Sequence, residues 1–81
     1  MNLERAAMVG QKTEKELMAK GLAIKASGLR DSLRLALLVT TPVDALDEER
    51  IASQALELSE TVIALRAVRA EIAVINKHLG S

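Results

Sequence analysis

The residues of this chain that could do chemistry are few and scattered. The only histidine, His78, lies near the C-terminal end. The Glu-x-x-His pattern that builds di-iron sites in helical bundles is absent, because Ile75 stands three residues before that histidine. The chain has no cysteine nucleophile, no serine or threonine with a recognisable histidine partner, and no P-loop spacing in "GLAIKASG" at 21–28. We therefore expect no enzymatic activity, no cofactor and no metal site.

One group of carboxylates could line a pocket. Glu57, Glu60 and Glu71 share the C-terminal half of the chain with Arg66 and Arg69, and some small helical enzymes combine such groups. On a helix these residues fall mainly toward the polar edges, so we interpret them as a solvated face.

A strip of basic residues offers a second chemistry, the binding of nucleic acid. Its members share the outward side of the first predicted helix: Lys12, Lys20, Arg30 and Arg34. Glu16 and Asp31 interrupt this strip, the 11 basic and 11 acidic residues of the chain cancel, and no aromatic side chain can stack on a base. We therefore do not expect a nucleic-acid partner. A small nucleic-acid-associated regulator that uses this strip is kept as the alternative function.

Composition predicts an all-α protein. Hydrophobic residues make up 49% of the 81 positions, which is too many for a disordered chain, and they are nearly all Leu, Ala, Val and Ile. Strands normally carry aromatic residues, and this chain has none. The charged N-terminal stretch does not resemble a signal peptide, and the longest apolar run, "LALLV" at 35–39, is far shorter than the ~20 residues that cross a bilayer. We expect a soluble, cytoplasmic protein without a membrane partner.

Only one segment, 39–50, breaks the helical pattern. It contains the single proline, Pro42, which disfavours helix at the residue before it and suits the first turn of a new helix. The whole chain is therefore predicted to be a single domain, with helix 1 at about 3–39, a turn at about 40–43 and helix 2 at about 43–79.

Helix 2 has expected start and stop signals. Thr41 or Asp44 could cap its beginning through a side-chain oxygen. At its end, Lys77 and His78 are followed by Gly80, which is typical of a helix C-terminus.

The equal helix lengths and the short connection predict a long antiparallel two-helix hairpin, folded about residues 41–42. Charge agrees with this pairing. Residues 1–40 carry seven basic and four acidic side chains, whereas residues 41–81 carry four basic and seven acidic ones. The two helices therefore attract each other weakly along their length.

Three glycines on one side of helix 1 predict where the helices touch. Glycine costs about 1 kcal/mol relative to alanine in a helix interior, and close packing of two backbones could offset that cost. The predicted hairpin seam comprises Leu17, Gly21, Ile24, Gly28 and Leu35 on helix 1, and Ile51, Ala55, Leu58, Val62 and Leu65 on helix 2. As an alternative, Gly21 could end one helix and start another.

Each helix carries a second apolar row that a lone hairpin would leave exposed. Soluble monomers avoid such patches, so we expect dimerisation into a coiled-coil-like four-helix bundle, or a higher even oligomer. The candidate oligomer interface comprises Met18, Leu22, Leu29, Leu33, Leu56, Ile63 and Ala70. The predicted function is that of a non-enzymatic helical protein–protein interaction module. It would be an adaptor, a small chaperone or an assembly or regulatory subunit that binds itself or another helical protein.

Overall fold

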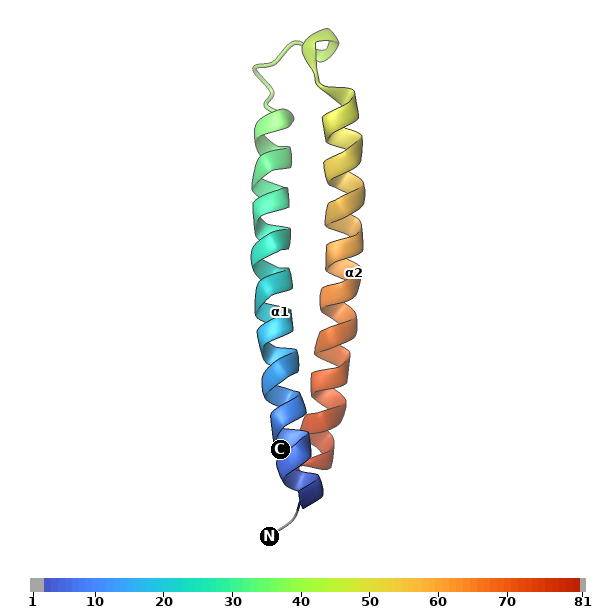
Figure 1. Ribbon diagram of the computed structural model, residues 1–81. Coiled ribbons are helices and arrows are strands. Elements are labelled where there is room, and N and C mark those ends of the chain that lie inside the picture. The colour runs from blue at the N-terminus through green and yellow to red at the C-terminus, as the bar shows by residue number, and fades with distance from the viewer. Residues whose placement is uncertain (1–2, 81) are drawn as a thin grey trace.

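The computed structural model describes residues 3–80 as two long helices that run antiparallel (Figure 1). Helix α1 spans Leu3–Ala36 and helix α2 spans Glu48–His78. A short 3₁₀ helix, η1, spans Val43–Ala45 in the connection, and no strand occurs within the described residues. The predicted all-α helical hairpin is confirmed.

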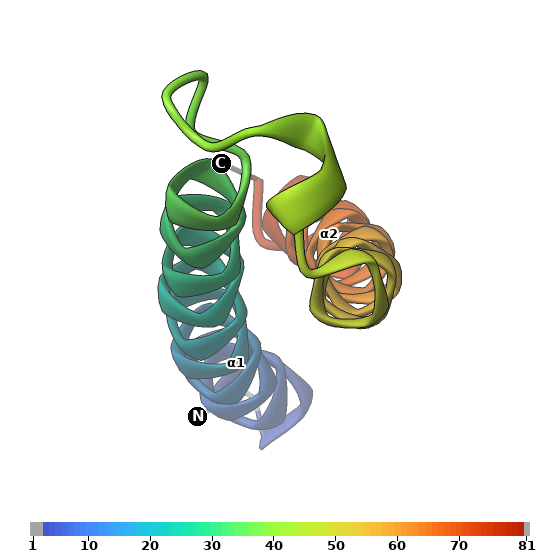
Figure 2. The same cartoon turned by 90° about the horizontal axis from the view of Figure 1, so that it is seen from above.

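The molecule is a rod. It measures 64 × 16 × 14 Å, and its radius of gyration is 18.2 Å. A compact domain of this length would have a radius of gyration of about 12 Å. Seen from above, α1 and α2 lie side by side and the connection crosses over their ends (Figure 2).

The connection is longer than the sequence predicts. Helix α1 ends at Ala36, not at 39, and α2 begins at Glu48, not at 43. The reason lies at Pro42, whose backbone is extended, with φ −57° and ψ 142°. The chain after it makes one 3₁₀ turn, closed by Ala45 N–H donating to the Pro42 carbonyl at 2.9 Å, and then extends again.

Consequently the cap of α2 is Asp47, and the prediction of Thr41 or Asp44 is wrong. The Asp47 carboxylate accepts a hydrogen bond of 3.1 Å from the Arg50 backbone N–H. This bond satisfies one of the four N–H groups left without partners at a helix start.

The predicted stop signal of α2 is confirmed. Leu79 N–H donates to the Ile75 carbonyl at 2.9 Å, and Gly80 N–H donates to the Lys77 carbonyl at 3.2 Å. Gly80 has a φ of +77°, a left-handed conformation that a residue with a side chain rarely adopts. Helix α1, by contrast, runs without interruption through Gly21, which excludes the alternative of a break there.

The helices meet along two heptad rows, which we call the hairpin seam. Buried or half-buried residues recur at alternating spacings of three and four on both helices, as in a coiled coil. The seam consists of Met8, Lys12, Lys15, Ala19, Leu22, Ala26, Leu29, Leu33 and Ala36 on α1, of Ile51, Gln54, Leu58, Thr61, Leu65, Val68, Ile72 and Ile75 on α2, and of Leu79 directly after α2. Among the described residues, only Leu33, Thr61, Leu65 and Val68 fall below about a tenth exposed, so the core is thin.

Polar contacts fix the register of the two helices. They are a hydrogen bond of 3.2 Å from Arg5 Nη1 to the Leu79 carbonyl, an ion pair between Lys15 and Glu71, an ion pair of 3.3 Å between Lys25 and Glu57, and a hydrogen bond of 3.0 Å from Ser32 Oγ to Gln54 Oε1. Each pair is nearly equidistant in sequence from residues 41–42, so the predicted register is correct.

Candidate interaction faces

The face of α1 predicted to form the hairpin seam points away from α2. The side chains of Leu17, Ile24 and Leu35 are 66%, 65% and 66% exposed. Gly21 and Gly28 are also exposed, and a Cβ built on either would meet nothing within 4 Å. The prediction for this half of the seam is therefore corrected.

The physical reason is that α1 is apolar on two nearly opposite sides. One side carries the hairpin seam, with Leu22, Leu29 and Leu33 at heptad spacing. The other carries a second heptad series, which we call the outward strip: Ala7, Gly10, Glu14, Leu17, Gly21, Ile24, Gly28, Asp31 and Leu35. In the hairpin, α2 covers the seam side of α1, which carries the three leucines, and the glycine-containing outward strip remains exposed to solvent.

On α2 the predicted seam is mostly right. Ile51, Leu58 and Val62 are half-buried and Leu65 is buried, whereas Ala55 is exposed. The difference from α1 arises because this half of the prediction rests on a heptad repeat without glycines.

The residues predicted for the oligomer interface divide in two. Leu22 and Leu29 are half-buried and Leu33 is buried, so these three belong to the hairpin seam rather than to a surface between subunits. The others remain exposed, with exposed fractions of 51% for Met18 and 62% for both Leu56 and Ile63, and with Ala70 also exposed.

Sequence reasoning missed one row of the α2 seam, which contains Gln54 and Thr61 and also the buried Val68. Thr61 is only 4% exposed, and its Oγ1 donates to the Glu57 carbonyl at 2.7 Å. Gln54 accepts a hydrogen bond from Ser32, whose Oγ also accepts one of 3.1 Å from Arg50 Nη2. The signal was present, since Gln54 and Thr61 share a heptad position with Val68 and Ile75, but the polar side chains of this row concealed it.

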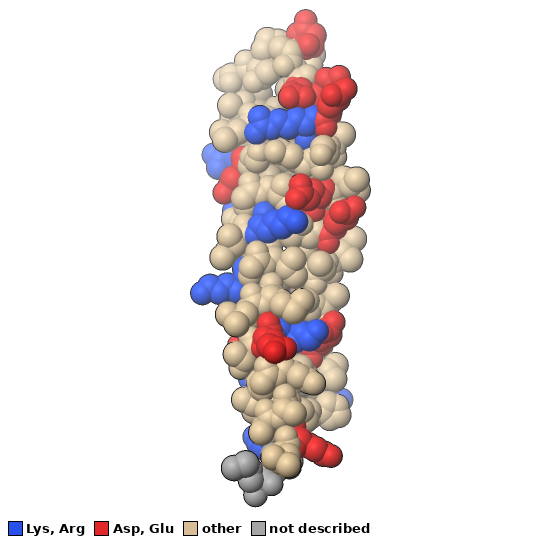
Figure 3. Space-filling view, viewed as in Figure 1, with Lys and Arg blue, Asp and Glu red and all other residues tan. Residues whose placement is uncertain are grey.

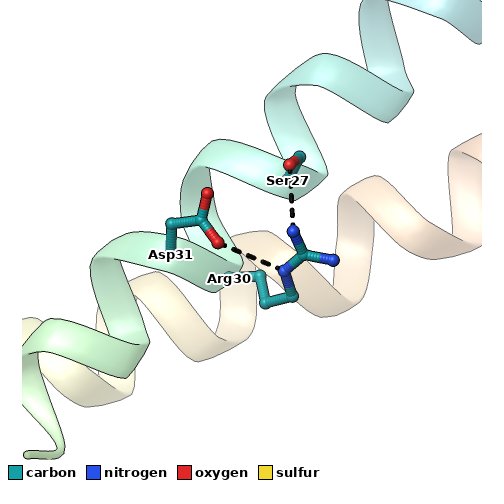
Figure 4. Close-up of polar contacts among 3 residues, drawn as sticks. All are labelled: Ser27, Arg30 and Asp31. Carbon is teal, nitrogen blue, oxygen red and sulfur yellow. Dashed lines mark hydrogen bonds and ion pairs between the residues drawn. The ribbon is translucent and has the colours of Figure 1, made fainter.

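One open groove of about 330 Å³ lies between the helices. Small α1 side chains leave this space beside larger α2 ones, and its lining is Ala23, Ala26, Ser27, Arg30, Leu58, Val62 and Leu65. The polar groups at its edge engage one another: Arg30 Nε donates to Asp31 Oδ1 at 3.3 Å, and Arg30 Nη2 donates to Ser27 Oγ at 3.2 Å. Figure 4 shows the Arg30 guanidinium held between these two side chains of α1. The floor of the groove is thus apolar, and the Arg30 side chain at its edge is already hydrogen-bonded within α1. The residues that line the groove do not include a pair of side chains suited to general acid–base catalysis.

The residues of the basic strip do not come together as one surface. Lys12 is half-buried in the hairpin seam, and Arg30 is engaged by Asp31. Lys20 and Arg34 are exposed, but 14 residues of helix separate them by about 21 Å. On the face that Figure 3 shows, basic and acidic side chains lie beside one another without a continuous basic patch.

The carboxylates of α2 are likewise used in part by the hairpin itself. Glu57 and Glu71 form ion pairs with lysines of α1. Within residues 3–80, no three acidic, histidine or cysteine side chains come together in a way that could hold a metal ion. Over the same range, neither helix has a stretch long and apolar enough to span a bilayer.

Fold and surface together define an all-α helical hairpin whose most distinctive feature is the outward strip. Comparisons of the chain with protein-family models, with curated proteins and with solved structures find no match. The function must therefore be inferred from the chain's own geometry.

Proposed function

We propose that the chain is a helical protein–protein interaction module that associates with a second copy of itself through an exposed apolar helix face. The observation that carries this proposal is the accessible surface of the hairpin, which is 6154 Å². A folded monomer of 8.7 kDa would expose about 4,700 Å². The excess, on the order of 1,400 Å², is larger than the ~800 Å² that each partner contributes to a standard protein interface.

The chemistry of that surface supports association. Leu17, Ile24 and Leu35 are each about two-thirds exposed on one side of α1, and the exposed aliphatics continue on α2 with Leu56 and Ile63. Covering such side chains is favourable at roughly 25 cal/mol per Å² of apolar surface. Adaptors, small chaperones and assembly subunits all use apolar helix faces of this kind.

Light scattering after size exclusion tests the proposal. We expect a mass near twice 8.7 kDa at micromolar concentration, detected by refractive index because the chain has no Trp or Tyr. Ile24→Glu should shift the mass to that of a monomer, because it would place a charge in an apolar contact. Val39→Glu, at a 99% exposed position in the connection, is the matched control and should leave the mass unchanged.

Two results would overturn the proposal. One is a wild-type chain that remains a monomer up to about 100 µM, well above the micromolar range expected of a weak interface. The other is an Ile24→Glu chain that dimerises as tightly as the wild type. Circular dichroism of the variant should show unchanged helix content, because residue 24 lies outside the hairpin seam.

A further inference from the structure

We infer that two copies pair their α1 helices antiparallel, outward strip against outward strip, so that every glycine of the strip in one copy receives an aliphatic side chain of the other. This inference rests on the proposed self-association and specifies its face, direction and register. The two-fold axis would pass between residues 22 and 23.

The pattern of large and small residues in the strip is self-complementary about that point. When the strip of a second copy is placed antiparallel against the first, three kinds of layer form between the copies: Gly10 against Leu35, Leu17 against Gly28, and Gly21 against Ile24. All three glycines and all three large aliphatics between residues 10 and 35 of the strip are used, and each layer occurs twice because of the symmetry.

Only the antiparallel direction gives this match. Gly21, Gly28 and Leu35 share one heptad position, and Gly10, Leu17 and Ile24 share the other. Antiparallel pairing sets one position against the other, so a large residue enters the space above a small one. A parallel pair in register would instead place glycine on glycine and leucine on leucine, which alternates voids with crowded layers.

The structure shows that the glycines are not needed within one hairpin. A Cβ at Gly10, Gly21 or Gly28 would meet nothing within 4 Å. Glycine is unfavourable in a helix interior, yet α1 carries these three on one side and none in its seam. Close approach of a second backbone is the circumstance in which the missing side chains are useful.

One kind of layer in this register carries like charges, which a neighbouring basic side chain would offset. The one layer that is not apolar sets Glu14 against Asp31 of the second copy, which brings two acidic groups together. Arg34, exposed beside the strip, would lie within one turn of Glu14 of the second copy and three residues from Asp31 of its own. Each acidic layer would therefore have a basic side chain next to it.

The area of the strip fits a reversible dimer. From Gly10 to Leu35 the strip is about 38 Å long and about 10 Å wide, on the order of 400 Å² per copy as a flat projection. Two such strips together bury about 800 Å², less than the ~1,000 Å² of a stable interface, so the dimer formed through the strips alone would be weak and reversible.

An exchange of one layer tests the register. Leu17→Gly alone should leave a void opposite Gly28, and Gly28→Leu alone should crowd Leu17, so each should weaken the dimer at least about tenfold. The double variant L17G/G28L has the wild-type composition and restores one large and one small residue to that layer. We expect its dissociation constant to return to within a few-fold of the wild-type value.

A distance measurement tests the direction. The chain has no cysteine, so Gln11→Cys at an exposed position beside the strip would carry a single spin label. Antiparallel pairing about residues 22–23 separates the two labels by about 35 Å, whereas a parallel pair would bring them within about 10–15 Å.

The outcomes separate this inference from the proposed function. A wild-type chain that never dimerises refutes both. If the wild type dimerises but the double variant binds as weakly as the single variants, the proposed function stands and the antiparallel pairing is refuted. The same holds if the two spin labels of the dimer lie close together. Restored affinity with the long distance supports both.

Discussion

At the scale of single residues, Gly21 shows how the effect of a glycine depends on what faces it. Its backbone is helical, and the position of its absent Cβ is open space. In a monomeric hairpin, Gly21→Ala should therefore raise the melting temperature by roughly 4–8 °C, since alanine is better in a helix by about 1 kcal/mol. Thermal unfolding followed by circular dichroism, at a concentration low enough to keep the chain monomeric, measures this.

Gly80 provides the contrasting control for that experiment. Its φ of +77° is unfavourable for any residue with a Cβ, so Gly80→Ala should not stabilise the chain. A destabilised Gly21→Ala monomer would mean that this glycine faces a neighbour within the hairpin, contrary to the structure.

Asp47 is the residue whose side chain starts α2. Asp47→Ala removes the acceptor of the Arg50 N–H bond and should lower the free energy of unfolding by about 1 kcal/mol. Asp44→Ala is the matched control, because no side-chain cap is formed at η1, and it should change the stability by less than about 0.5 kcal/mol. Urea unfolding of the two variants shows whether Asp47 or Asp44 is the cap. A larger decrease in the free energy of unfolding for Asp44→Ala than for Asp47→Ala would reverse the assignment.

At the scale of elements, the sequence sufficed for the two helices, their direction and their register, but not for the rotation of α1. On α2, the heptad row that contains Ile51, Leu58 and Leu65 was predicted to face α1, whereas the second row of the seam, with Gln54, Thr61 and Val68, was not. Helix α1 has two such rows on opposite sides, one containing Leu22, Leu29 and Leu33 and the other containing glycines. Periodicity locates both rows but carries no information on which of them faces α2 and which faces solvent or another chain.

The connection was missed for a different reason. Pro42 correctly marks the turn, but a proline suits both the first turn of a helix and an extended segment. The extended conformation at Pro42 and the cap at Asp47 together shorten α2 by five residues relative to the prediction.

Truncating one leucine on each face of the hairpin checks the rotation of the helices. Leu65→Ala, at a side chain 9% exposed, should destabilise the monomeric hairpin by about 2–4 kcal/mol through lost burial and the cavity left behind. Leu17→Ala, at a side chain 66% exposed, should change the stability by less than about 0.5 kcal/mol. Denaturant unfolding at low concentration measures both values, and a loss at Leu17 equal to that at Leu65 would show that the glycine-containing row faces α2.

At the scale of the whole molecule, charged side chains of both signs are mixed along the rod, and some of them join the two helices as ion pairs. The net charge is zero, and the lysines at 15 and 25 are paired with glutamates of α2. A mobility-shift titration at 150 mM salt should accordingly show at most weak association with DNA or RNA, with a dissociation constant of about 100 µM or more. Sub-micromolar binding that is lost in a K20E/R34E variant would instead support the nucleic-acid alternative.

The rod shape and thin core also predict that the thermal stability of the protein depends on its concentration. A partner that binds only the folded chain stabilises it by mass action, and for a dimer that unfolds as it dissociates each tenfold increase in concentration adds about 1.4 kcal/mol per dimer. For about 160 residues this corresponds to a rise in melting temperature of roughly 3–6 °C per tenfold increase. The Ile24→Glu variant should melt at the temperature of the wild-type monomer at every concentration. Its hairpin seam is unchanged, but the charge in its outward strip should prevent dimerisation. A wild-type melting temperature that stays constant from about 1 to 100 µM, where a micromolar dimer would form, would show that the exposed faces of this hairpin do not stabilise it through a second copy.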